Sequence, residues 1–281
     1  LMDQPYLDEE PQHEMSFVDH LEELRWHIIR ALASIFIFGT IAFLAKSFVF
    51  HDIILAPSRP DFLSYRVMCE IGERMGSDVL CIKEMGFTIQ SRQMSGQFTM
   101  HLLVSAILGL AAAFPYAFWE IWRFVKPGLY PRERKNSQGA VFFVSILFAM
   151  GLLFGYYVVS PISINFLAGY QVDPSIVNEF DLSSYISTLT TLCLACAFMF
   201  EMPVIVYFLT KAGLITSETM KLYRRHAFIV ILIIGAIITP PDVISQLLIS
   251  MPLMLLYEAS ISISKSIRAK DLKRLNENNT L

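Results

Sequence analysis

Residues 182–210 read LSSYISTLTTLCLACAFMFEMPVIVYFLT, a run in which Glu201 is the only charged residue. About 20 consecutive apolar residues cross the hydrocarbon core of a bilayer as an α-helix, and a helix satisfies its own backbone hydrogen bonds there. The run therefore predicts a transmembrane helix. A charged side chain at the centre of such a helix costs roughly 2.5–3.5 kcal/mol on insertion scales, so we expect Glu201 to face a cavity or a partner.

The rest of the chain repeats this pattern. Five more stretches are nearly free of charge, at residues 31–45, 102–119, 140–160, 227–238 and 243–257. The third is expected to end at Pro161, and the last two, joined by a turn at 239–242, are shorter than the bilayer is thick. The sequence thus predicts an all-α polytopic membrane protein with six transmembrane helices, the last two of them short.

The composition agrees with a membrane protein. Hydrophobic residues make up 54% of the chain and charged residues only 17%, against roughly 25% charged in soluble domains. The net charge of -3 gives no global basic field that would attract nucleic acid. A disordered chain, a secreted disulfide scaffold and a nucleic-acid binder are therefore excluded, and the lipid bilayer is the expected surrounding.

Lysine and arginine orient the predicted helices. If the N-terminus is cytoplasmic, 16 of the 22 Lys and Arg lie in cytoplasmic segments, and the other six all lie in the first outer loop. Both termini are therefore expected in the cytoplasm. We interpret residues 1–265 as a single six-helix domain, with an external cap at 47–99, followed by a polar cytoplasmic tail at 266–281.

Familiar catalytic patterns are missing from the sequence. It contains no phosphate loop ending in Gly-Lys-Ser/Thr, no His-Glu-x-x-His and no Gly-x-Ser-x-Gly. Its six His are scattered over both sides of the predicted membrane. We therefore expect no enzymatic activity, no metal site and no cofactor.

Carboxylates gather on the expected cytoplasmic face. Residues 19–27 read DHLEELRWH, and residues 127–135 read PGLYPRERK. From the residues alone, the first segment fits an amphipathic helix end in the headgroups, and the second a basic anchor in which Glu133 only neighbours cations. For Glu201, the alternative to a partner is a carboxyl satisfied inside its own bundle by the Ser and Thr side chains around 188–191.

The four cysteines fall into two pairs. Cys69 and Cys81 lie in the expected external cap, where an oxidising compartment permits a disulfide that would staple the cap; the sequence leaves open whether they pair. Cys193 and Cys196 are one helical turn apart in the predicted fourth span. Small core packing is the expected role of these two thiols.

Five segments, taken in order, resemble the TatC family, the core subunit of the twin-arginine protein translocase. They are HLEELR at 20–25, WRFVKPGLY at 122–130 with ERK at 133–135, FEMP at 200–203, LIT at 214–216 and TPPDVISQ at 239–246. The chain departs from the family at His27, where an arginine is usual, and at Glu120, where a glutamine is usual. Its first outer segment is also longer than usual.

This resemblance implies a function in protein transport. A TatC-like subunit recognises signal peptides with two consecutive arginines and nucleates assembly of the single-span subunits TatA and TatB, for export of folded proteins driven by the proton-motive force. Carboxylates are the best partners for a planar, permanently charged guanidinium. The resemblance therefore implies that Glu23 and Glu133 contact the two arginines, with Glu120 as a third carboxylate.

The resemblance implies roles for further residues. Phe124 would contact the hydrophobic residues after the arginine pair, and Arg25 and Lys135 would orient the acids. Glu201 and Gln246 would form a polar patch that docks TatA or TatB. The protein would lie in the inner membrane of a prokaryote, and it would form homo-oligomers within the complex. The competing function is a proton-coupled secondary transporter that uses Glu201.

Overall fold

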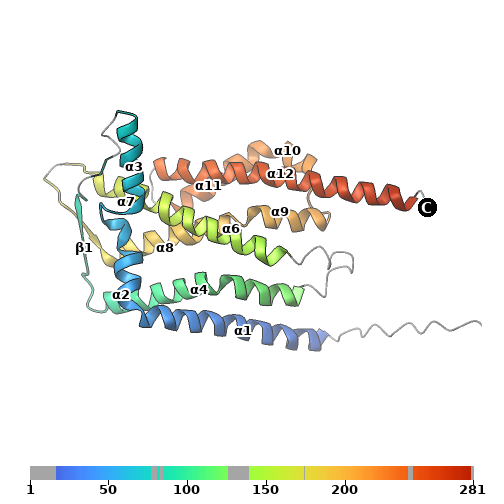
Figure 1. The fold of residues 1–281 in the computed structure, drawn as a ribbon, viewed down its shortest axis with the longest axis horizontal. Helices are drawn as coiled ribbons and strands as arrows, with labels where there is room; N and C mark the ends of the chain where they lie inside the picture. Colours follow the sequence, from blue (N-terminus) through green and yellow to red (C-terminus); the bar gives the residue numbers. More distant parts are fainter. Residues whose placement is uncertain are drawn as a thin grey trace, which may run out of the picture.

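The computed structural model describes residues 17–76, 81–82, 85–125, 139–173, 175–239 and 243–279. Long helices run side by side along one axis, and a small cap covers one end of them (Figure 1). Five helical stretches are long and apolar enough to cross a membrane: Glu22–Leu44, Gly96–Val125, Ala140–Gly169, Leu182–Lys211 and Ser245–Ala269. The predicted helical class is therefore confirmed, and five of the six predicted spans meet this criterion.

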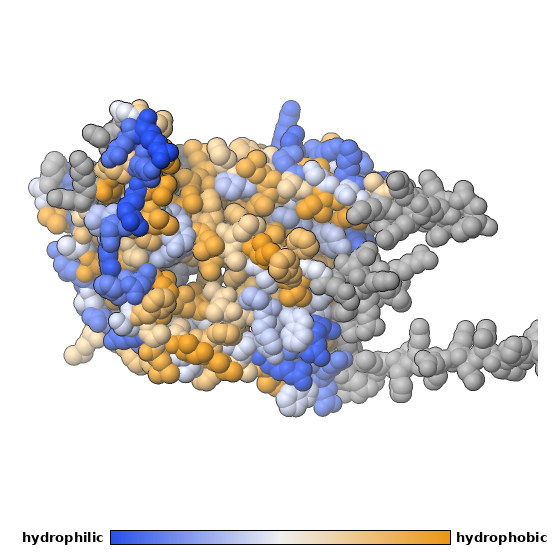
Figure 2. Space-filling view, in the orientation of Figure 1, coloured by the Kyte–Doolittle hydropathy of each residue, from blue (hydrophilic) through white to orange (hydrophobic). Residues whose placement is uncertain are grey.

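The bundle has the following elements in chain order: α1 (Phe17–Leu44), α4 (Gly96–Val125), α6 (Ala140–Phe154), η5 (Gly155–Val159), α7 (Ser160–Gly169), α8 (Leu182–Met199), α9 (Met202–Lys211), α10 (Ser217–Leu222), α11 (Arg224–Ile238) and α12 (Val243–Asn279). On the face that Figure 2 shows, hydrophobic residues form a broad belt across the middle of this bundle, and hydrophilic residues gather toward both ends. Within the belt, side chains such as Phe36 point outward, and this ring is 76% exposed. Such a surface fits lipid and not water.

The third span does not end at Pro161, as the sequence analysis expected. The π-helical turn η5 joins α6 to α7, so the helix continues to Gly169. Pro161 stands in the first turn of α7, where its missing N–H is tolerated. The Ser160 hydroxyl donates to the Gly155 carbonyl at 2.7 Å, which satisfies an acceptor in the altered turn.

The fourth span is broken where its carboxylate lies. α8 ends at Met199 and α9 begins at Met202, with Phe200 and Glu201 in a turn between them. Pro203 occupies the first turn of α9, where it has no N–H to offer to the preceding turn. The break therefore follows from the Glu-Met-Pro sequence.

The last two helices were both predicted to be short, and of the two only α11 is. α11 has 15 residues and is too short to be one of the five stretches that could cross a membrane. α12, by contrast, is not short: its apolar stretch has 25 residues and continues past Tyr257, and Glu258 within it forms an ion pair with Arg224 of α11. α12 also carries the described part of the expected polar tail as helix, to Asn279.

The cap contains strands, which an all-α prediction missed. Its elements are α2 (Lys46–Phe48), η1 (Val49–Ile54), η2 (Ala56–Ser58), α3 (Leu63–Arg74), β1 (Phe87–Gln90) and β2 (Asn178–Asp181). β1 and β2 pair in parallel with Phe87 opposite Asn178, so two loops far apart in sequence are joined. Asp181 caps α8 by accepting from the Ser183 amide, and it also accepts from the Ser183 hydroxyl. The bond from this hydroxyl, together with the one from the Arg92 amide, lowers the pKa of Asp181.

Glycine permits a close contact between α1 and α4. A Cβ placed on Gly109 of α4 would lie 2.6 Å from the Gly39 backbone of α1. Because backbone atoms cannot move aside, Gly109→Ala is expected to separate α1 from α4. Overpacking of this kind costs about 1–3 kcal/mol, or roughly 3–10 °C in thermal midpoint. The measurement is thermal unfolding of the purified chain. In the control Gly169→Ala the added Cβ meets nothing within 4 Å, so the thermal midpoint should not change.

Candidate functional site

A pocket of about 430 Å³ opens at the end of the bundle opposite the cap. Its lining comes from the first turns of α1 and the last turn of α4: Glu23, Trp26, His27, Arg30 and Arg123. We call it the basal pocket. Residues three and four apart lie on one helix face, and this spacing aligns the α1 residues toward α4. The amphipathic helix end expected at residues 19–27 therefore faces a second helix.

Glu120 lies beneath the basal pocket with only 1% of its surface exposed. The His27 Nδ1 and the Glu120 Oε2 are 2.6 Å apart, and the Tyr116 hydroxyl donates to Oε1 at 2.9 Å. The guanidinium groups of Arg30 and Arg123 lie 3.9 and 4.0 Å from the same carboxylate. Glu120 is thus surrounded by donors of this chain, which is how a buried carboxylate is normally accommodated.

The two departures from the family pattern are in direct contact. His27 of α1 is buried, and its ring meets Glu120 of α4 across the helix interface. An imidazole can donate to a carboxylate whether it is neutral or charged. The pair therefore fixes the relative position of α1 and α4 at the pocket.

Glu23 differs from Glu120 in its exposure. It is exposed on the wall of the basal pocket and makes no hydrogen bond or ion pair with any residue that the structure describes. The guanidinium of the neighbouring Arg25 lies over the Trp26 ring at 5.7 Å from the centroid. Phe124 is half-buried, with its ring 6.3 Å from that of His27. The structure thus brings Glu23, Glu120 and Phe124 to one end of the bundle, while Glu133 and Lys135 lie outside the described residues.

The sequence analysis did not name four residues of this site: Trp26, Arg30, Tyr116 and Arg123. Tyr116 donates to Glu120, and Arg123 lines the pocket while its guanidinium lies 4.9 Å from the Trp119 ring centroid. The signal was present, since Tyr116, Glu120 and Arg123 recur at helical spacing on α4. This spacing could be recognised as part of a site only once the structure showed that this part of α4 faces α1.

Glu201 occupies the break between α8 and α9 and is 8% exposed. Its Oε1 is buried and has no hydrogen-bond partner in the described part of the chain. The expected internal alternative is not seen: the Thr190 hydroxyl donates to the Ile186 carbonyl, and Thr188 and Thr191 line a separate groove with Ile238. An unsatisfied buried polar atom costs about 1–3 kcal/mol, so the Glu201 carboxyl is an energetically costly group in the described part of the chain.

Gln246 is not brought together with Glu201. Its side-chain amide donates to the Leu232 carbonyl at 3.2 Å and so ties α12 to α11. Gln246 stands near the start of α12, at the cap end, whereas Glu201 follows the 18-residue helix α8, which also starts at the cap end. At about 1.5 Å per residue, the two lie at different depths in the bundle.

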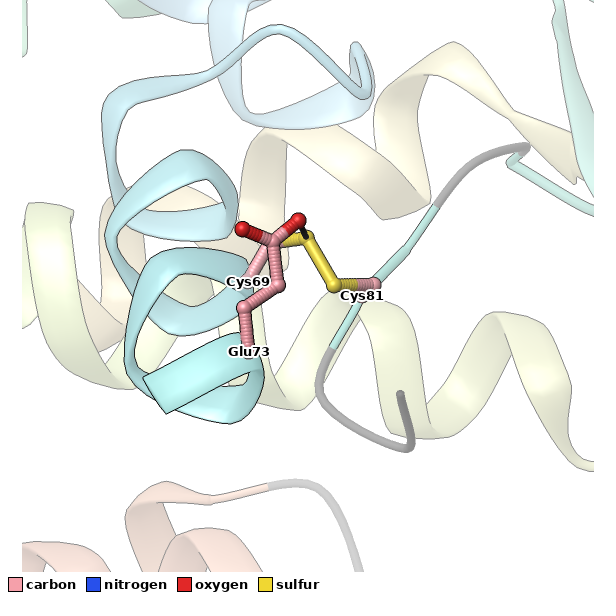
Figure 3. Close-up of a disulfide and its surroundings, with 3 residues drawn as sticks. All are labelled: Cys69, Glu73 and Cys81. Carbon is pink, nitrogen blue, oxygen red and sulfur yellow. Dashed lines mark hydrogen bonds between the residues drawn. A yellow bond between two sulfur atoms is a disulfide. The ribbon is translucent and has the colours of Figure 1, made fainter. Parts of the chain in front are cut away.

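Cys69 and Cys81 are joined in a disulfide beside α3, so the pairing left open by the sequence is present in the structure (Figure 3). Glu73 lies next to the bridge, with its Oε1 3.8 Å from the Cys69 sulfur. The sulfur atoms of Cys69 and Cys81 and the Glu73 carboxylate are close enough together to hold a metal ion. The sulfur of a disulfide is not a thiolate, however, and does not bind a metal ion. Cys193 and Cys196 are free and buried, as expected for core packing.

A family model described as Sec-independent protein translocase protein (TatC) matches residues 19–252. The chain belongs to the TatC family. The TatC of Blattabacterium from Periplaneta americana is 37% identical over 261 residues, which cover 92% of this chain and 98% of that protein. The TatC of Helicobacter pylori strain J99 is 44% identical over 177 residues, covering 62% and 71%.

Solved structures agree with this family. A crystal structure of the twin arginine translocase receptor TatC has a TM-score of 0.64 and 29% identity, covering 88% of this chain and 98% of that one. A second, determined in the detergent DDM, has a TM-score of 0.68. As a TatC family member, the chain is a multi-pass membrane protein of the Tat translocase complex, with a role in protein transport and not in catalysis.

Proposed function

We propose that this chain is the translocase subunit that receives signal peptides bearing two consecutive arginines. The observation that supports this most directly is the basal pocket, in which one exposed carboxylate, Glu23, is free of partners among the described residues. The cations in its wall, Arg30 and Arg123, already face the buried Glu120. The pocket is therefore suited to a guanidinium from outside.

In this proposal the two signal-peptide arginines meet Glu23 and Glu133. Phe124, at the end of α4, contacts the hydrophobic residues that follow the arginines. Arg25 and Lys135 orient the acids and keep them ionised. Lysine is a poor substitute in the peptide, because an ammonium lacks the planar fork that binds a carboxylate through two hydrogen bonds.

We assign Glu120 to the same site as a positioning residue. Its burial and its four neighbours make direct contact with a peptide arginine less favourable than contact at Glu23. Its single negative charge offsets part of the positive charge of Arg30 and Arg123, which weakens their repulsion of the incoming arginines. Glu120 therefore affects peptide binding through Arg30 and Arg123 and not through direct contact with the peptide.

A charge-rescue experiment separates this role from direct contact. Glu120→Gln leaves Arg30 without its anion, and is expected to weaken binding of a labelled twin-arginine peptide roughly fivefold, about 1 kcal/mol for a partly screened charge. Adding Arg30→Gln should restore most of the lost affinity. The measurement is fluorescence anisotropy with the chain in nanodiscs.

The control for arginine removal is Arg92→Gln, which breaks an exposed ion pair with Glu179 in the cap and should not rescue. If Arg30→Gln gave no rescue in the Glu120→Gln background, Glu120 would be a direct ligand. If Glu120→Gln left binding unchanged, it would have no part in the site.

We further propose that Glu201 docks a single-span partner of the TatA or TatB kind. The orphaned Oε1 supports this, since a polar side chain of a partner helix would supply its missing donor. Gln246 then serves at a second, cap-end contact on the α11–α12 hairpin. Docking at both places would nucleate assembly for export driven by the proton-motive force, with more than one copy of this chain in the complex.

The proposal includes a topology. α11 is taken as a short sixth span, with local bilayer thinning around it, which places both termini in the cytoplasm and the chain in the inner membrane. Residues 1–265 then form the transmembrane domain, 47–99 its external cap and 266–281 the cytoplasmic tail. A proton-coupled transporter is less well supported, because Glu201 has no ionisable partner among the described residues.

A further inference from the structure

Helix α3 in the cap presents a row of apolar side chains to its surroundings. Members of the row recur at every fourth residue, with exposed fractions of 49% for Leu63, 44% for Val67, 47% for Ile71 and 74% for Met75. Residues four apart lie on one helix face. Three charged side chains of α3 fall outside the arc of this row, Arg66, Glu70 and Glu73, whereas Arg74 falls within it at the end of the helix. α3 is therefore amphipathic in the way that interfacial helices are.

The apolar row is continuous with the face that α3 buries. Tyr65 and Gly72 are buried against the rest of the molecule. On a helical wheel of 100° per residue, Ile71 and Met75 fall between this buried face and the charged one. The disulfide at Cys69 leaves from the charged side of the wheel. The row therefore lies beside the face of α3 that contacts the bundle, and it does not point back into the cap.

The contacts of α3 place it at a definite height on the bundle. The Phe62 ring stacks on Tyr157 with centroids 5.6 Å apart, and the Ser64 hydroxyl donates to the Tyr157 carbonyl. The Tyr65 hydroxyl donates to the Pro161 carbonyl at 3.0 Å. α3 is thus attached to the third span between residues 157 and 161.

That height coincides with the edge of the hydrocarbon core. The third span begins at Ala140, so Tyr157 and Pro161 stand 17 and 21 residues along it. At about 1.5 Å per residue, these positions are roughly 26 and 32 Å from its start, against a hydrocarbon thickness of about 30 Å. α3 also runs across the bundle axis (Figure 1), and the hydrophobic belt begins beside it (Figure 2).

We propose that α3 is an interfacial helix whose apolar row enters the lipid at the boundary between headgroups and acyl chains on the cap side. The occupant of this surface is the bilayer itself. Arg74, within the arc of the row at the end of the helix, is long enough to keep its charge among the headgroups. The helix would anchor the cap laterally, and the Cys69–Cys81 bridge would transmit this anchoring to the loop that follows.

Site-specific photocrosslinking to lipid tests the proposal. The photoreactive residue p-benzoylphenylalanine replaces Ile71 in the apolar row or, as a matched control, the adjacent Glu70. Each purified chain is reconstituted in liposomes of phosphatidylethanolamine and phosphatidylglycerol, irradiated and examined by mass spectrometry. Placement at Phe36, which is 76% exposed in α1, provides the positive control.

The expected result is a lipid adduct at Ile71 in at least about fivefold higher yield than at Glu70, since only the apolar face enters the acyl region. The pair Val67 and Glu73 should repeat the difference, which guards against a local folding defect. Equal yields on the two faces would overturn the proposal. So would crosslinks mainly between two protein copies, or no lipid adduct at Ile71 while Phe36 reacts.

Discussion

Glu23→Ala is expected to lower the affinity of the chain for a twin-arginine signal peptide by about tenfold or more. A hydrogen bond that involves charged partners contributes roughly 1.5–3 kcal/mol, and a forked guanidinium–carboxylate pair lies at the strong end. Glu23 is the exposed carboxylate of the basal pocket, so no neighbouring acid in its wall replaces it. The measurement is peptide binding in nanodiscs, followed by export of a folded reporter in cells that carry only the variant.

The neighbour Glu22 provides a matched control. It is also exposed on α1 but lies about 100° further around the helix and outside the pocket lining. Glu22→Ala removes the same net charge and should leave binding within about twofold, because a single exposed charge contributes little. Equal losses for the two variants would show that Glu23 acts only through general surface charge.

Glu201→Met is expected to raise the stability of the isolated chain and to weaken its association with TatA and TatB. In the isolated chain it removes a buried oxygen without a hydrogen-bond partner, which should raise the thermal midpoint, by an amount equivalent to about 1–3 kcal/mol. In the complex it removes the acceptor for the proposed partner helix. Co-purification of TatA and TatB, and export with it, should therefore fall several-fold.

The control for this second variant is Thr191→Val, which removes an exposed hydroxyl from the neighbouring groove on α8. It should change neither the thermal midpoint nor the yield of partner. The account of Glu201 would be wrong if Glu201→Met destabilised the isolated chain while partner co-purification stayed at the parental level. That outcome would assign the carboxylate to internal packing.

The sequence predicted the bundle well, because apolar runs of about 20 residues are determined by the bilayer and not by tertiary contacts. Its errors lie where local patterns compete with packing. Pro161 was taken as a helix end, but a π-helical turn and the Ser160 hydroxyl accommodate it. The last span was expected to end at Tyr257, but α12 continues past it, and Glu258 forms an ion pair with Arg224 of α11. The parallel β1–β2 pair joins Phe87 to Asn178, 91 residues further along the chain, which no local pattern reveals.

The site was predicted only in part for a similar reason. Glu23 and Glu201 stand out in the sequence because a carboxylate beside or within an apolar run is rare. The environment of Glu120 depends on how α1 meets α4, and that contact is set by Gly39 and Gly109, whose spacing carries no chemical signal. The pairing of His27 with Glu120 joins two departures from the family that the sequence showed only separately.

The central claim, that the basal pocket receives twin arginines, is tested most directly by a photoreactive probe at Phe124. This residue lies beside His27 at the pocket and is proposed to contact the peptide just after its arginine pair. The probe is challenged with a twin-arginine signal peptide and with its twin-lysine counterpart. We predict a crosslink to the arginine peptide that is lost with lysine; equal crosslinking of the two peptides, or of neither, would contradict the claim.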